Sequence, residues 1–215
     1  MMLMQLVRKD FLIVKKYVFF MMLLAVAVPL FVAWKQPEIT GIISFVYTVV
    51  LTELIICQGV SQEESKFPKA AALLCSVPYK RSAIVKAKYV FFLLLYAYCW
   101  AVYTVMALLV PGVGAIDLTV VLSVLLVGMI LYGIYLPLYF KYGVEKTRFF
   151  FMICIFAISF GMPIFYNYFT SLHIDFSMLA SIPAAVINLI LLILFAVTLG
   201  VSMTISIRIY SKKEL

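Results

Sequence analysis

The sequence predicts an all-α integral membrane protein with six transmembrane helices. Of its 215 residues, 67% are hydrophobic and only 12% are charged, whereas about a quarter of the residues are charged in a typical soluble domain. The apolar residues form six runs, and about 20 such residues are enough for a helix to cross the hydrocarbon core. We therefore expect residues 1–215 to form a single transmembrane domain.

Each expected span is a run of apolar residues bounded by polar or charged ones. The six runs are Tyr17–Ala33, Ile39–Cys57, Tyr89–Val110, Leu118–Phe140, Phe149–Phe169 and Met178–Ile207. The last run is longer than one crossing needs, so we expect this helix to tilt or to extend into water.

Residues 1–16, MMLMQLVRKDFLIVKK, combine apolar and charged side chains at helical spacing. Apolar residues at 3, 7, 11 and 14 fall on one face, which favours an amphipathic helix lying in the cytoplasmic interface. The alternative is a basic leader that only orients the first span.

The Lys and Arg residues predict the orientation, because cytoplasmic loops carry an excess of them. They precede the first run, lie between the second and third and between the fourth and fifth, and follow the sixth. Only Lys35 lies on the opposite side. Both termini are therefore expected in the cytoplasm. Because these cations are spread over four segments, we expect no nucleic-acid partner. The apolar composition instead predicts contact with membrane lipid.

Residues 58–88 form the largest expected connection, on the cytoplasmic side. Pro68 suits the first turn of a helix, the alanine-rich stretch after it favours helix, and Pro78 ends it. Ser82 can cap a second helix that enters the third span, with Lys86 and Lys88 at the membrane surface.

A helix of about two turns cannot stabilise itself in isolation, so the one after Pro68 needs a docking surface. The bilayer interface is one candidate and a partner protein is the other. Each buried methyl group contributes only about 0.8 kcal/mol, so the alanine-rich face favours a protein groove.

Two segments resemble those of a known family. LLCSVPYKRSAIVKAKY at 73–89, preceded by Glu63, resembles the loop of ABC-2 type transporter permeases, where a pattern like LPxSRxxIVxAKY leads into the third span. LVRKDFLIVKKY at 6–17 resembles the start of that family. In length and topology the whole chain is similar to small bacterial exporter permeases without a large extracellular domain. It departs from the pattern at Tyr79, where a smaller residue is frequent, and at Cys75, where Ser is frequent.

This resemblance implies a coupling helix that seats in a cleft of a cytoplasmic ABC ATPase subunit. The residues concerned are Pro68, Lys69, Ala70, Ala71, Ala72, Leu73 and Leu74. Two ATPase subunits, carrying ATP and Mg²⁺, and a second identical or different permease chain would complete the transporter. The resemblance also implies a bacterial cell membrane and export of peptide-like or amphipathic cargo, including antimicrobial peptides or immunity to them, with lipids and drugs as further options.

The chain has no G-x-x-x-x-G-K-[ST] motif, so an ATPase would have to be a separate polypeptide. We expect no cofactor in this chain. Its four cysteines are far apart and its one histidine is not near them, so no metal site is expected. No catalytic set of residues can be assembled, and the chain is expected to be a non-catalytic subunit.

Three polar residues within the spans are candidates for the substrate pathway or for gating. Glu53 lies inside the second run, where an unpaired charge is costly. It either contacts cargo or forms a structural ion pair with a cytoplasmic Lys or Arg. Asn188 and Asn167 are weaker candidates, for which interhelical hydrogen bonds are the competing interpretation.

The competing function is a self-contained secondary carrier or an assembly factor that does not use ATP. A carrier should have more paired intramembrane ionisable residues than Glu53 alone.

Overall fold

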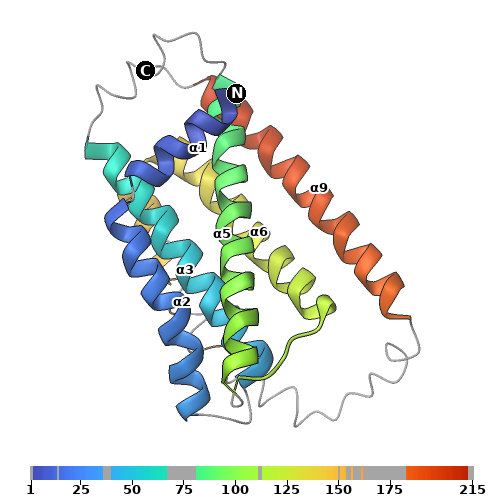
Figure 1. Ribbon diagram of the computed structural model, residues 1–215. Helices are drawn as coiled ribbons and strands as arrows, with labels where there is room; N and C mark the ends of the chain where they lie inside the picture. The colour runs from blue at the N-terminus through green and yellow to red at the C-terminus, as the bar shows by residue number, and fades with distance from the viewer. Residues whose placement is uncertain are drawn as a thin grey trace.

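The computed structural model is a bundle of long helices, and the residues that it describes contain no strand. These are residues 2–13, 15–35, 40–66, 81–110, 113–149, 151–153, 156, 161 and 183–212. The helices are α1 (Met2–Ile13), α2 (Lys15–Lys35), α3 (Thr40–Lys66), α5 (Arg81–Leu109), α6 (Leu118–Tyr142) and α9 (Ala184–Ser211) (Figure 1). The prediction of an all-α fold is confirmed for this part of the chain.

Four helices, α3, α5, α6 and α9, are long and apolar enough to cross a membrane. Helices α1 and α2 together make a fifth candidate, broken by a bend of 80° between Ile13 and Tyr17. The expected span Phe149–Phe169 and the residue Asn167 lie largely or wholly outside the described residues, as does the expected coupling helix Pro68–Leu74.

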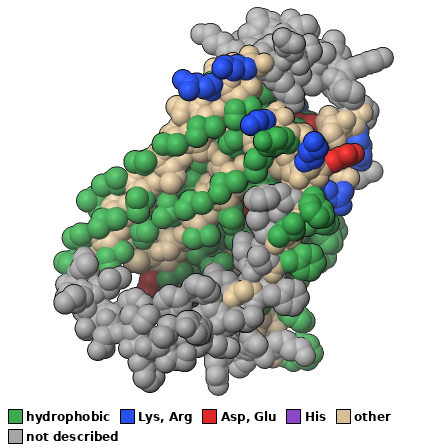
Figure 2. Space-filling view, turned by 180° about the vertical axis from the view of Figure 1, so that it is seen from behind, with side chains coloured by type: hydrophobic (Ala, Val, Ile, Leu, Met, Phe, Trp, Pro, Cys, Tyr) green, Lys and Arg blue, Asp and Glu red, His purple; other side chains and the backbone are tan. Residues whose placement is uncertain are grey.

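The surface is that of a multi-pass membrane protein. Figure 2 shows hydrophobic side chains over a broad area of the bundle, with Lys and Arg gathered toward one end. Helix α9 is the extreme case, because none of its most apolar 18-residue stretch is buried. Its strongly exposed apolar residues are Val186, Leu189, Ile190, Leu192, Ile193, Leu194, Val197, Val201 and Ile205. Such a surface is stable in lipid and not in water.

The side of α9 that faces the bundle combines apolar residues with two serines. Its buried residues are Ser202 and Ser206, and both contact the hydroxyl of Tyr89 on α5. Ser202 also donates to the carbonyl of Gly133 on α6 at 2.8 Å. A Cβ on Gly133 would lie only 3.0 Å from Ser202 Oγ. Small residues and hydroxyls therefore bring α6 and α9 together, as is common between membrane helices.

Helix α3 extends further than its apolar run predicts, continuing beyond Cys57 to Lys66. Helix α5 begins at Arg81, close to the predicted helix start at Ser82, and continues into the third apolar run. The connection between them is thus residues 67–80. The polar last turns of α3 remain helical because they pack in the bundle: Tyr135 donates to Ser61 Oγ at 2.8 Å.

The helix ends that carry most basic residues lie at one end of the bundle. In Figure 1 the end of α3, the start of α5 and the C-terminal end of α9 are at the top, and α1 crosses the same region. The Lys and Arg residues in these segments include Lys9, Lys66, Lys88 and Arg208. This end also contains the attachment points of the 67–80 connection.

Candidate functional site

Charged side chains from three helices meet where α3 ends and α5 begins. Lys88 Nζ of α5 lies 2.8 Å from Glu64 Oε2 of α3 and 3.9 Å from Asp10 Oδ2 of α1. Lys9 Nζ lies 3.0 Å from Glu64 Oε1 and 3.2 Å from Asp10 Oδ1. We call these four residues the charged cluster. It joins both ends of the 67–80 connection to the N-terminal helix.

The charged cluster is largely withdrawn from solvent. The side chains of Lys88 and Asp10 are 7% and 3% exposed, whereas those of Glu64 and Lys9 keep 19% and 28%. The Tyr139 hydroxyl of α6 donates to Glu64 Oε2 at 3.2 Å. A buried charge that loses its partner is strongly destabilising, so these contacts favour one relative placement of α1, α3, α5 and α6.

Helix α2 joins the same end of the bundle through Tyr17. Its hydroxyl donates to Glu63 Oε1 at 3.4 Å, and Glu63 also pairs with Lys66 at 2.7 Å. The Tyr17 ring packs against Gly59 of α3, where an added Cβ would lie 3.3 Å from the ring. The close approach of α2 and α3 therefore depends on the missing side chain at residue 59.

The expectation that Lys88 lies at the membrane surface is wrong. Lys86 is exposed as expected, but Lys88 is buried because two carboxylates from α1 and α3 surround its ammonium group. One feature of the sequence indicates this arrangement: Asp10 follows Val7 by three residues and so lies on the apolar face of α1. A carboxylate on that face requires a buried cation.

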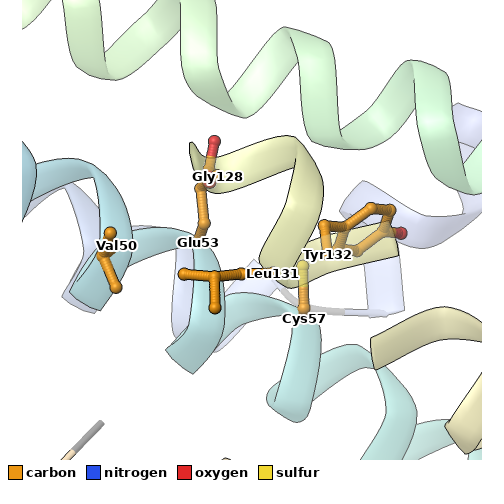
Figure 3. A pocket seen from close by; sticks show the side chains of 6 residues that line it. All are labelled: Val50, Glu53, Cys57, Gly128, Leu131 and Tyr132. Carbon is orange, nitrogen blue, oxygen red and sulfur yellow. The ribbon is translucent and has the colours of Figure 1, made fainter. Parts of the chain in front are cut away.

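Glu53 lies on α3 at the contact with α6, and only 4% of its surface is exposed. Among the described residues its Oε1 has no hydrogen-bond partner. Figure 3 shows the side chain reaching toward Gly128, and a Cβ at that glycine would lie 3.0 Å from Oε2. Beside it is a small cavity of ≈ 10 Å³, which is also lined by Cys57 and Tyr132. This is about the space for one water molecule.

No ion pair between Glu53 and a cytoplasmic Lys or Arg forms within the described part of the chain. Glu64, three helical turns further on, takes the lysine partners instead. The two residues are eleven positions apart, about 16 Å along the helix axis, and none of the ion pairs of the charged cluster includes Glu53. The expected structural role thus belongs to Glu64.

The other candidates are only partly placed. Asn188 is half-buried near the start of α9, and its Oδ1 has no hydrogen-bond partner among the described residues. Asn167 and the coupling-helix residues Pro68–Leu74 are outside those residues. Within the described ranges, no three His, Cys, Asp or Glu side chains come together as a metal site would require.

Three tyrosines at heptad spacing on α5 were not recognised as functional positions from the sequence. Tyr89 hydrogen-bonds to the two serines of α9. Tyr96 donates to the carbonyl of Val121 in the first turn of α6. Tyr103 donates to the carbonyl of Gly41 on α3 at 2.9 Å. Each hydroxyl thus joins α5 to a different helix. The seven-residue spacing predicts a common face, but only the packing reveals three partners.

Residues 5–211 match the family described as ABC-2 family transporter protein. The chain belongs to this family. Members of the ABC-2 family are typically non-catalytic membrane subunits that associate with ABC ATPases. Neither a curated protein nor a solved structure matches the chain.

Proposed function

We propose that this ABC-2 family chain is the transmembrane permease subunit of an exporter driven by a separate ATPase. The observation that carries the proposal is the charged cluster at the base of the 67–80 connection. Glu64, in the last turn of α3, pairs with Lys88 in the second turn of α5 at 2.8 Å. Helix α1 contacts Glu64 through Lys9 and Lys88 through Asp10. A force on the connection acts on two spans and on α1 together.

In this proposal, the residues Pro68–Leu74 form the coupling helix that docks on the ATPase. ATP and Mg²⁺ bind to the two ATPase subunits, and the chain itself holds no cofactor. When the ATPases close, the coupling helices move, and the charged cluster passes this movement to α3 and α5. The tyrosine contacts of α5 extend it to α6 and α9.

In the proposed topology, residues 1–215 form one permease domain with six spans. Both termini lie in the cytoplasm. It is supported by the gathering of Lys9, Lys66, Lys88 and Arg208 at one end of the bundle, since cytoplasmic segments are enriched in positive charge. The membrane proposed is the bacterial cell membrane.

We further propose that the working unit contains two permease chains, identical or different, and exports a peptide-like or amphipathic substrate. The exposed apolar faces of the bundle offer surface for lipid and for a second chain. Glu53, Asn188 and Asn167 stay proposed pathway or gating residues. The cavity beside Glu53 has room for about one water and not for such a cargo, so any contact requires α3 and α6 to separate.

Co-purification with a candidate stand-alone ABC ATPase subunit, followed by an ATPase assay in proteoliposomes, tests the proposal. Leu73→Asp and Ala71→Arg should weaken binding and abolish stimulation of ATP hydrolysis by the permease. Ala115→Arg is a matched control, because Ala115 is exposed in the connection at the other end of the bundle. Normal stimulation by the two loop variants, or transport with no ATPase present, would contradict the proposal and favour a self-contained carrier.

A further inference from the structure

The carboxyl group of Glu53 and the charged cluster are linked by two small cavities in series. The first lies beside Glu53 and is lined by Cys57 and Tyr132. The second cavity also has a volume of ≈ 10 Å³. Its lining includes Asp10, Cys57, Ser61, Lys88, Tyr132 and Tyr135. The cavities share two lining residues, Cys57 and Tyr132, so they lie next to each other.

Each cavity has polar groups that can bind a water molecule. A buried water needs two to four polar partners. The first cavity offers Glu53 Oε1, which has no partner among the described residues, together with the thiol of Cys57. The second offers Ser61, the carboxylate of Asp10 and the ammonium group of Lys88. Beyond it, Lys9 and Glu64 are partly exposed to solvent.

The surroundings of Glu53 contain no cation among the described residues. The titratable groups that face it are Cys57 from its own helix, Tyr96 and Cys99 from α5, and Tyr132 from α6. None of these carries a positive charge in any protonation state. An ionised carboxylate at this position would be buried without compensation, and such groups neutralise instead.

We propose that Glu53 is a proton-binding site of the membrane domain, occupied in this arrangement and connected to the charged end of the bundle through the two cavities. The neutral carboxyl donates its O–H to one water molecule in the first cavity. When the site empties, this O–H bond breaks, its electron pair stays on Glu53 as a carboxylate, and the proton passes through the second cavity to bulk water. The bound proton keeps α3 packed against Gly128 of α6, because a carboxylate there would need more water than the cavity holds.

Infrared difference spectroscopy of the full chain in lipid nanodiscs tests the protonation state. At neutral pH we expect the C=O stretching band of a neutral carboxylic acid, displaced in D₂O and absent from Glu53→Gln. Asp117→Asn is the control, since Asp117 is exposed before α6 and its loss should leave the band unchanged. Absence of the band from the unmodified chain, or its persistence in Glu53→Gln, overturns the proposal. This measurement needs no ATPase, so its outcome is independent of the proposed transport function.

The route is tested by the rate at which the band shifts after transfer to D₂O. Cys57→Leu fills the space between the cavities and should slow the exchange at least about tenfold, equivalent to about 1.4 kcal/mol in the barrier. Cys57→Ser keeps both this space and a polar partner for the water, and should exchange at the original rate. Ser61→Val removes a polar group from the second cavity and should also slow the exchange. With two variants, the test does not depend on one of them folding. Unchanged rates in the folded Leu and Val variants would exclude this route.

Discussion

Lys88 Nζ of α5 lies 2.8 Å from Glu64 Oε2 of α3, near the two ends of the 67–80 connection. The same ammonium group is 3.9 Å from Asp10 of α1, and its side chain is 7% exposed. The pair therefore links two expected spans and the N-terminal helix in a region with little water, where its loss should be measurable.

Glu64→Gln should destabilise the bundle, because it leaves Lys88 buried with only the more distant Asp10 carboxylate. We expect a loss of about 1.5–3 kcal/mol, the usual range for a hydrogen bond to a charged group. Reversible unfolding in mixed micelles measures it. In a double-mutant cycle, adding Lys88→Met should cost less than it does in the unmodified chain. Lys66→Met, which removes an exposed partner of Glu63, is the control and should have little effect.

Tyr89→Phe should weaken the attachment of α9. The substitution removes the hydroxyl that lies 2.6 Å from Ser202 Oγ and 3.0 Å from Ser206 Oγ. Interhelical hydrogen bonds in membrane proteins contribute about 0.6 kcal/mol on average and about 1.7 kcal/mol at most. Tyr98→Phe, on the same helix, is a matched control. An equal loss of stability in both variants would show that the serine contacts contribute nothing specific.

Gly133→Ala should separate α6 from α9, since the new Cβ would lie 3.0 Å from Ser202 Oγ and 3.2 Å from Ser202 Cβ. Atoms at these distances must move, so we expect a lower thermal unfolding temperature. Gly200→Ala introduces the same methyl group in α9 where no atom lies within 4 Å. Ala is favoured over Gly in a helix by about 1 kcal/mol, so this control should be at least as stable as the unmodified chain. A stabilised Gly133→Ala variant would contradict the close packing.

Cysteine labelling checks the predicted orientation. With Cys75 and Cys154 changed to Ser, a membrane-impermeant maleimide should label Lys66→Cys only in inside-out vesicles and Asp117→Cys only in intact cells. The two positions are exposed at opposite ends of the bundle, and positive charge favours the cytoplasm. Cys57 and Cys99 are buried and should contribute no background. The reverse labelling pattern would mean that the termini face outward.

The family and the fold class follow from the sequence alone, because both depend on local properties of the chain. Apolar runs of about 20 residues favour membrane helices, and the 6–17 and 73–89 segments resemble ABC-2 permeases, a resemblance that the family match confirms. The end of α3 was predicted less well. Polar residues such as Gln62–Lys66 end an apolar run without ending the helix, and neighbouring helices keep it folded.

What only the tertiary structure decided is which side chains meet. Hydropathy does not show which face of α9 packs inward, because nearly every residue on the helix is apolar and its two buried residues, Ser202 and Ser206, are polar. Nor could spacing assign the lysine partners to Glu64 rather than to Glu53, since the choice depends on α1 crossing the end of α3. Electrostatic pairing acts over a few ångströms between helices that are far apart in the chain, and only their packing brings Lys9 and Lys88 to the Glu64 carboxylate and Asp10 to Lys88.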